Sequence, residues 1–495
     1  MTPDILTTIF SPFNLLMMNI GMAAGIIIGA LPGLSAVIAI TILLPVTFGL
    51  ESIPGMYILL GAYCGAVFGG SITAILINTP GTPSAAATTL DGYRMAQNGR
   101  AGDALRCALT ASTVGGLLSC FSLLFIAPTL AKMALKFGPA EYFSLCLFGL
   151  TIVVSISGEN VFKGLVMAGL GLFASTVGID ATEGTPRFIF GNSYLLTGFN
   201  AAVVMLGVFA ISEVLDKSRR SMESSEINTK YAKATMSYKE IFKHWKTMLW
   251  SSIYGIFIGA VPGTGGAISA FFSYNEAKRR SKHPEKFGTG IPEGVIAPET
   301  GNNAVTGATL IPLLTLGIPG DTAVAVLFGA LTMQGIIPGP ELFSEDKFWV
   351  YCIMGGLFII NIFMFLQGAL FNRLFANVAR IPFSVLVPCI VIFCVIGGFS
   401  VANNSFNVFV LLGFGLLGYI MKRLGFPLAP MTIALVLGKL TENNLRRALI
   451  LSQGSISIFF TRPLSLVFLL IAVASLLYPS VRKLIKNKKA GKATN

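Results

Sequence analysis

The sequence predicts an all-α polytopic membrane protein with two inverted structural repeats, each containing a re-entrant hairpin and a broken transmembrane helix. Its 495 residues are 54% hydrophobic and 12% charged, whereas soluble domains carry about 25% charged residues. Long apolar runs recur from end to end, so membrane segments make up most of the chain. The interruption GALPGLSA at 29–36 returns as GAVPGTGG at 259–266, 230 positions later.

The first hairpin is predicted at 13–49. Proline removes a helix donor and clashes with the preceding turn, so the Pro-Gly pair ends a helix inside an apolar run. Each arm has about 16 residues and would span about 25 Å, less than the roughly 30 Å of a bilayer core. The flanks carry Asp4 and Glu51 but no positive charge, so both are expected outside.

The first broken helix is predicted at 57–90, around the sequence LINTPGTPS. The basic segment after it, DGYRMAQNGRAGDALR, is expected in the cytoplasm. Further apolar runs complete a first repeat over residues 1–215; they cover 107–130, 142–157, 161–179 and 197–215.

The second hairpin, 248–275, is predicted to enter from the opposite side. Residues 216–247 form a linker with eight Lys or Arg and four acids, and 276–286 hold five Lys or Arg and two acids. Both segments are expected in the cytoplasm, because basic loops are retained there. A hairpin between them therefore dips in from the cytoplasm and returns.

The second broken helix, 295–333, contains TLGIPGDTA, in which Pro319 follows Pro80 by 239 positions. The acidic segment after it is expected outside, so this helix runs opposite to the first one. Further apolar segments complete a second repeat over 248–480; they cover 348–371, 384–398, 403–421 and a helix at 463–480.

The C-terminal part is predicted less completely. Residues 427–462 either cross once or dip and return. Strict inversion would put the C-terminus outside, but the basic tail 481–495 carries six Lys or Arg. These charges favour the cytoplasm and require one extra crossing.

Inverted halves that each contain broken helices are typical of secondary transporters. Non-helical backbone is tolerated at membrane depth only where it is buried in protein or lines a watery cavity. The four breaks are therefore expected to meet at one central site. We expect an elevator mechanism, in which the hairpins and broken helices move against a scaffold of the other helices.

The predicted site lacks cationic side chains, because residues 1–93 and 288–346 contain no Lys or Arg. Helix N-termini and hydroxyl groups favour carboxylates without a formal charge. A polycarboxylate is the expected ligand, although a neutral polar solute would also suit. The candidate donors follow the breaks: Ser35, Thr79, Thr82, Ser84, Thr264, Gly265, Gly266 and Thr322.

Ionisable groups in membrane segments point to coupling with a cation. The segment PETGNN places Glu299, Asn302 and Asn303 at the start of the second broken helix, and Asp321 follows its Pro-Gly break. These groups would take a proton or bind Na⁺. Two alternatives stay open: Glu299 as an interfacial helix-start residue, and Asp321 as the cap of a half-helix beginning at Thr322. Asp91 and Glu293 are expected at the interface.

Other function classes fit the sequence less well. The net charge of +13 comes from short loops between apolar runs rather than from a nucleic-acid surface. With only two histidines, the chain has little material for a metal site or a hydrolase triad, and no metal or organic cofactor is expected. A membrane channel remains the alternative, because channels also use re-entrant segments.

Several motifs resemble the large membrane subunit of the tripartite tricarboxylate transporters (TctA type). They are GALPGLSA, GGSITAILINTPGTPSAAATTLDGYRMAQNGRAGDAL, GAVPGTGG, PETGNNA and LGIPGDTAVAVLFGAL. The resemblance covers nearly the whole chain. It maps the family's signature onto Gly33, Ser35, Thr79, Pro80, Gly81, Thr82, Pro83, Gly263, Thr264, Gly265, Gly266, Pro319, Gly320, Asp321 and Thr322.

This resemblance implies a permease of the bacterial inner membrane with two partners: a small four-helix membrane subunit and a periplasmic solute-binding protein. It also implies uptake of citrate-like or other carboxylates, driven by a Na⁺ or proton gradient. A permease of the related tripartite ATP-independent type, for another organic anion, is the nearest alternative.

Overall fold

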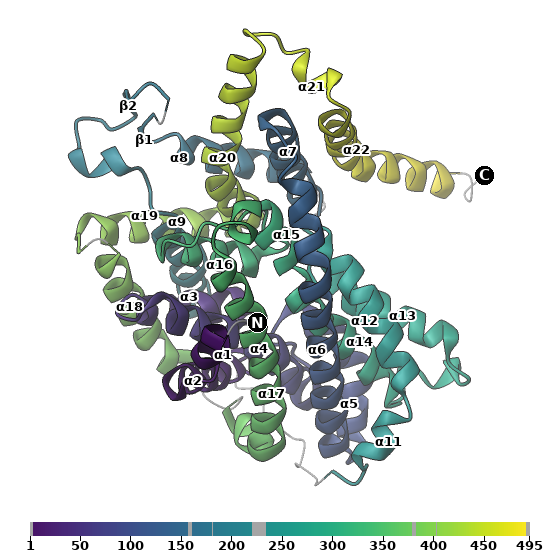
Figure 1. The fold of residues 1–495 in the computed structure, drawn as a ribbon. Helices are drawn as coiled ribbons and strands as arrows, with labels where there is room; N and C mark the ends of the chain where they lie inside the picture. Colours follow the sequence, from purple (N-terminus) through teal and green to yellow (C-terminus); the bar gives the residue numbers. More distant parts are fainter. Residues whose placement is uncertain are drawn as a thin grey trace.

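The computed structural model describes residues 3–156, 161–180, 182–219, 234–378, 383–401 and 403–491. Nearly all the regular structure in these ranges is helical (Figure 1), and one two-stranded antiparallel hairpin joins β1 (Gly178–Ile179) to β2 (Pro186–Arg187). The predicted all-α class is confirmed.

The first half of the chain contains the two breaks predicted for it, at 30–35 and 78–82. Its helices are α1 (Pro3–Ile9), α2 (Pro12–Gly29), α3 (Ala36–Thr47), α4 (Ser52–Ile77), η1 (Pro83–Thr88), α5 (Thr89–Gln97), α6 (Ala101–Ala134), α7 (Pro139–Ile156), α8 (Val161–Ser175), η2 (Ser193–Thr197), α9 (Ala201–Met205), the π-helical η3 (Leu206–Ile211) and α10 (Ser212–Arg219).

The second half contains its two predicted breaks at 261–264 and 317–321. Its helices are α11 (Tyr238–Phe242), α12 (Trp245–Ala260), α13 (Gly265–Arg280), η4 (Pro284–Lys286), α14 (Glu293–Ala308), α15 (Leu310–Leu316), α16 (Thr322–Met333), η5 (Pro340–Phe343), α17 (Lys347–Val378), α18 (Phe383–Ser400), α19 (Phe406–Arg423), α20 (Ala429–Leu451), α21 (Ile458–Thr461) and α22 (Pro463–Gly491).

Within each half, the first arm of the hairpin packs closely on the broken helix. A Cβ atom at Gly21, Gly25 or Gly29 of α2 would lie within 2.5 Å of a carbonyl oxygen of α4. In the second half, a Cβ at Gly255 of α12 would lie 2.5 Å from the Gly301 oxygen of α14. Glycine lets the two backbones touch, as small residues do between membrane helices.

The two halves also interlock. The long helix of each half packs on the broken helix of the other half. A Cβ at Gly115 of α6 would lie 2.3 Å from the Thr300 oxygen of α14, and a Cβ at Gly356 of α17 would lie 2.2 Å from the Tyr57 ring of α4. These contacts between the halves bring the breaks of both halves toward the centre of the molecule.

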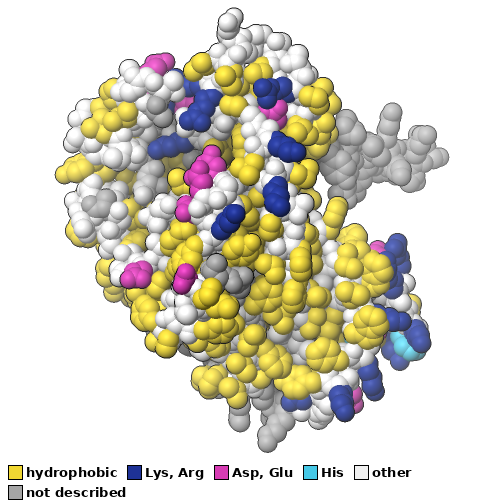
Figure 2. Space-filling view, viewed as in Figure 1, with side chains coloured by type: hydrophobic (Ala, Val, Ile, Leu, Met, Phe, Trp, Pro, Cys, Tyr) yellow, Lys and Arg dark blue, Asp and Glu magenta, His cyan; other side chains and the backbone are white. Residues whose placement is uncertain are grey.

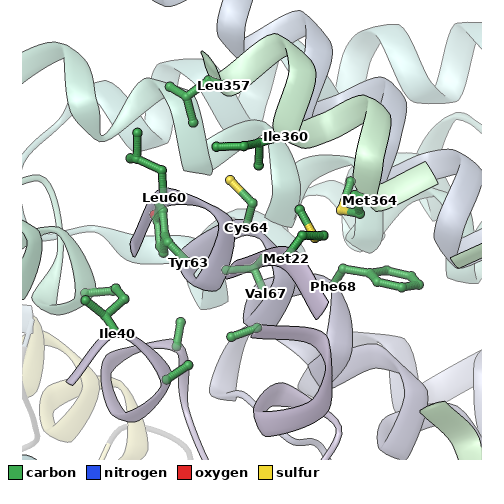
Figure 3. Close-up of a cluster of buried hydrophobic side chains, with 14 of the residues drawn as sticks. Met22, Ile40, Leu60, Tyr63, Cys64, Val67, Phe68, Leu357, Ile360 and Met364 are labelled. Carbon is green, nitrogen blue, oxygen red and sulfur yellow. The ribbon is translucent and has the colours of Figure 1, made fainter. Parts of the chain in front are cut away.

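Helix α4 forms the centre of the largest apolar core. Its side chains Tyr63, Val67 and Phe68 are buried in one cluster with Met22 of α2 and Met364 of α17 (Figure 3). Within the described residues, five helices are long and apolar enough to cross a membrane: Pro12–Gly29, Ser52–Ile77, Ala101–Ala134, Lys347–Asn372 and Phe406–Arg423.

Large apolar side chains are exposed on the outer helices, for example Phe125 of α6, Phe257 of α12 and Leu370 of α17. Figure 2 shows hydrophobic side chains over the middle and lower parts of one face, with Lys and Arg at its edges. Such a surface is expected to contact lipid rather than water. The surface and the five long apolar helices indicate a membrane protein.

Three predicted segments differ in detail. Residues 429–451 form one continuous helix, α20, so the stretch 427–462 does not dip and return as a helical hairpin. The helix predicted to begin at 197 begins at Ala201. The elements β1, β2 and η2 precede it and were not predicted. The predicted linker 216–247 contains the end of α10, all of α11 and the start of α12, and its residues 220–233 lie outside the described ranges.

Candidate functional site

One cavity of about 410 Å³ borders residues that follow all four breaks. Ser35 lies at the first break, Thr82 at the second, Thr264 at the third and Asp321 at the fourth. The remaining lining residues come from α3, α4, η1, η3, α10, α13, α14, α16, α19 and α20; they are Ala36, Val37, Ile38, Tyr63, Val67, Pro83, Ser84, Phe209, Ser212, Glu213, Gly265, Gly266, Ala267, Asn302, Val305, Thr306, Thr322, Ala323, Lys422, Leu428 and Ala429.

The two hairpin tips have the same backbone conformation. Gly33 has φ of +74° and Gly263 has φ of +85°, a left-handed conformation that side chains with a Cβ rarely adopt. The amide of Gly263 donates a hydrogen bond of 2.7 Å to the carbonyl of Gly320. The tip of the second hairpin is therefore joined directly to the break of the second broken helix.

The second and fourth breaks also correspond. Helix α4 ends at Asn78 with φ of +56°, and α15 ends at Gly317 with φ of +70°. These two left-handed residues are 239 positions apart, the same offset as Pro80 and Pro319. The Gly81 amide donates to the Gly70 carbonyl at 3.2 Å, so this break folds back against its own helix.

Three α-helices begin at the cavity wall: α3 after Ser35, α13 after Thr264 and α16 after Asp321. The first N–H groups of a helix have no partner within it, and the helix dipole is positive at that end. Among the described residues, the Ser35 and Thr264 side chains make no capping hydrogen bond to their own helices. This cavity therefore offers amide donors and hydroxyl groups to an anion.

Residues 15–433 match the sequence model of the family described as "Tripartite tricarboxylate transporter TctA family". The chain belongs to this family. A protein of Agrobacterium vitis, described as "Uncharacterized 52.8 kDa protein in TAR-I ttuC' 3'region", is 38% identical over 479 residues, which cover 96% of this chain and 95% of the relative. The predicted family membership is confirmed.

A second Agrobacterium vitis protein, "Uncharacterized protein in TAR-II ttuC' 3'region", is 39% identical over 231 residues, covering 46% of this chain and 96% of that protein. No solved structure matches the chain. Membership of the TctA family makes this protein the membrane subunit of a tripartite tricarboxylate transporter.

Asp321 of this TctA-family protein both caps a helix and faces the cavity. Its Oδ1 accepts a 2.8 Å hydrogen bond from the Val324 amide, and its Oδ2 accepts one of 3.2 Å from the Tyr63 hydroxyl. The capping role that was left open is thus present. Because its carboxylate also lines the cavity, the role does not exclude contact with a ligand.

The other predicted coupling residues separate into two groups. Asn302 lines the cavity, and its buried Nδ2 has no hydrogen-bond partner among the described residues. Glu299 is fully buried behind the wall, where Thr88 of η1 and Ser112 of α6 donate to its two oxygens. Asn303 also lies behind the wall and donates to Ser112 at 2.8 Å.

Glu299 was expected at the start of its helix, with an interfacial position as the alternative. Helix α14 begins at Glu293, so Glu299 lies in its second turn and inside the protein. Its carboxylate is buried because α6 packs along α14 and supplies a polar partner for it. The depth of Glu299 relative to the membrane surface stays a prediction.

Asp91 was expected at the membrane interface, and its depth in the membrane stays a prediction. Its carboxylate is fully buried and accepts hydrogen bonds from the Tyr274 hydroxyl at 2.8 Å and from the Gly288 and Gly290 amides. It joins α5 to α13 and to the segment before α14. Glu293 lies nearer the surface, between His244 and Ser281.

Seven of the predicted binding residues do not line the cavity: Gly33, Thr79, Pro80, Gly81, Gly263, Pro319 and Gly320. The glycines among them fix the break geometry instead. A Cβ at Gly81 would lie 2.0 Å from the Gly29 oxygen, and one at Gly320 would lie 2.8 Å from Thr309. Thr79 is exposed.

Sequence reasoning missed the charged group at the cavity. Lys422 of α19 lines it together with Glu213 of α10, and the Lys422 ammonium pairs with Glu213 and, at 3.0 Å, with Asp216. Lys217 donates to the Pro32 carbonyl at the first hairpin tip. The segments 1–93 and 288–346 indeed carry no basic side chain, but α19 brings a cation from outside them. A lysine that directly follows the apolar run 403–421 was the available signal.

Proposed function

We propose that this protein is the permease subunit of a binding-protein-dependent secondary transporter of the bacterial inner membrane. It would import tricarboxylates or other carboxylates with a Na⁺ or proton gradient. The observation that supports this proposal is the meeting of all four breaks at one cavity. Family membership supports the class of substrate.

The cavity offers a carboxylate ligand two kinds of contact. Donors come from the Ser35 hydroxyl, the Asn302 side-chain amide and the first backbone amides of α3 and α13. The Thr264 hydroxyl already donates to the Ile258 and Val261 carbonyls. Lys422 would supply the positive charge by turning from Glu213 and Asp216 toward the ligand. Through this change of partner, the Lys422 ammonium would stay paired at every stage. This matters because a cation removed from water without a partner is costly.

The cation would be coupled through Asp321 and Glu299. Asp321 faces the cavity and holds the start of α16, so a cation or proton there would change the field at the substrate. Glu299 contacts Thr88, six residues after Thr82 of the second break. Binding of a cation or proton at either carboxylate would therefore affect the backbone that borders the ligand.

We propose two inverted repeats and an elevator motion. The moving part contains the hairpins α2–α3 and α12–α13 with the broken helices, and the other helices form the scaffold. The cavity is bordered by the proposed moving elements on one side and by Phe209, Glu213 and Lys422 of proposed scaffold helices on the other. Structures of outward-open and inward-open states test this directly. Breaks that stay fixed against α10 and α19 in both states would contradict the motion.

The partners follow from the tripartite family: a small four-helix membrane subunit and a periplasmic solute-binding protein. The test is uptake of radiolabelled carboxylates into proteoliposomes, with and without the binding protein, under imposed Na⁺ or pH gradients. We expect saturable accumulation that requires a gradient and the binding protein. Downhill flux that never saturates would instead support a channel or uncoupled facilitator. Selective uptake of an organic anion without a carboxylate would contradict the proposed substrate class.

A further inference from the structure

A second cavity, of about 580 Å³, lies between the bases of α12 and α13, away from the cavity at the breaks. It is lined by four Lys or Arg (Lys243, Lys246, Arg280 and Lys282) and by two carboxylates (Glu276 and Glu293). Both carboxylates already have partners: Arg279 and Arg280 pair with Glu276, and His244 and Ser281 contact Glu293. The cavity therefore keeps an excess of positive charge.

Three of its cations are available to a ligand. Within the described part of the chain, Lys243, Lys246 and Lys282 form no ion pair. At the inner wall, the Ser273 hydroxyl is 1% exposed and has no hydrogen-bond partner among the described residues. A buried polar group without a partner is costly, and an oxygen-rich anionic ligand would supply one.

An apolar stripe begins at the same cavity. Trp250 lines the cavity, and Ile253 and Phe257 follow it on the same face of α12, with exposed fractions of 44% for Ile253 and 74% for Phe257. The Arg280 guanidinium lies 4.4 Å from the centre of the Trp250 ring, so it is held at the junction of cavity and stripe. Figure 2 shows Lys and Arg side chains beside hydrophobic surface at the α13 edge.

We propose that this cavity binds the headgroup of an anionic phospholipid, with one acyl chain along the exposed face of α12. The phosphate would contact Lys246 and Lys282, and the Ser273 hydroxyl would turn toward it. The aromatic residues and the basic charges place this end of the hairpin at the cytoplasmic interface, where anionic headgroups lie. Basic cavities between membrane helices are known to select such lipids.

The tryptophans of the chain give a direct test. There are three: Trp245, Trp250 and Trp349, and the first two line this cavity. The variant Trp349→Phe, in nanodiscs of phosphatidylcholine, leaves only the two reporters at the site. Bromine-labelled phosphatidylglycerol, added at a low fraction, is expected to quench their fluorescence more than bromine-labelled phosphatidylcholine at the same fraction. Each lysine is expected to contribute about a fivefold preference.

Adding Lys246→Gln and Lys282→Gln in the same background should remove most of this preference. Lys278→Gln with Lys286→Gln is the matched control, because both are exposed on the same hairpin base but do not line the cavity. Equal quenching by the two lipids, or a preference that survives the first pair of substitutions, would overturn the proposal. If added inorganic phosphate abolished the lipid preference, the cavity would be a free-phosphate site. If addition of the small membrane subunit abolished the preference, this face would be covered by protein. Either result would also overturn the proposal.

Discussion

The breaks of the two broken helices correspond in sequence position but differ in chemistry. Each ends at a left-handed residue, Asn78 or Gly317, and each continues through Pro-Gly at the same offset. At the next position the first has Thr82 and the second has Asp321. The Thr82 hydroxyl bonds to the neighbouring Ser84 hydroxyl, whereas the Asp321 carboxylate caps α16 and contacts Tyr63.

The hairpin tips differ in the same way. The first tip is contacted by Lys217, which belongs to a group of charged residues with Glu213, Asp216 and Lys422. The second tip bonds to the backbone of Gly320. Corresponding positions of the two halves can therefore have different roles. The local sequence determines where the helix breaks, and distant helices determine which side chains contact the break.

The largest expected effect is at the carboxylate that distinguishes the two broken helices. Asp321→Asn keeps a capping oxygen for the Val324 amide but removes the charge, so folding should change little. We expect uptake to fall about a hundredfold, equivalent to about 2.7 kcal/mol, with loss of dependence on the coupling cation. Proteoliposome uptake at varied Na⁺ and pH measures both.

The matched variant is Thr82→Val at the equivalent position of the first half. It should weaken substrate binding by a few-fold, about 1 kcal/mol for one lost hydrogen bond, and leave cation dependence intact. If Asp321→Asn kept normal cation dependence, this carboxylate would have no part in coupling.

The next effect concerns backbone contact at the breaks. Gly81→Ala places a methyl group against the Gly29 carbonyl, whereas Gly320→Ala meets Thr309 at a longer distance. We expect a stability loss of about 1–3 kcal/mol for Gly81→Ala and a smaller loss for Gly320→Ala. Thermal midpoints in detergent measure the difference. Equal midpoints would show that the first break relaxes as easily as the second.

A smaller effect is expected at the cation that lines the cavity. Lys422→Gln should raise the KM for the carboxylate about tenfold, equivalent to about 1.4 kcal/mol, because the ligand loses its cation. Arg423→Gln is the control, since Arg423 is exposed and does not line the cavity. Similar KM values for the two variants would remove Lys422 from the binding site.

The smallest effect compares two left-handed glycines. Gly265→Ala meets no atom within 4 Å, so only its φ of +68° opposes the change. Its cost should be about 1 kcal/mol. Gly33→Ala should cost slightly more, because it also displaces the Lys217 ammonium from the Pro32 carbonyl. Denaturation midpoints that rank in the reverse order would show that the Lys217 contact is weak.

Much of the helical layout was predictable from the sequence. Pro-Gly pairs mark all four breaks, and apolar runs mark the helices between them. The site was predictable in part: Ser35, Thr82, Thr264 and Asp321 line one cavity. The full burial of Glu299 and Asp91 could not be predicted, because the sequence near a carboxylate does not show which distant hydroxyl or amide groups pack around it.

The sequence alone determined where helices stop, because proline and glycine act on the backbone within a few residues of themselves. It also determined the membrane class through composition and charge. Only the tertiary structure decided which side chains share a cavity. Lys422 reaches the breaks, and Glu299 lies behind them, because close packing of glycine-lined helices fixes the rotation and depth of each helix.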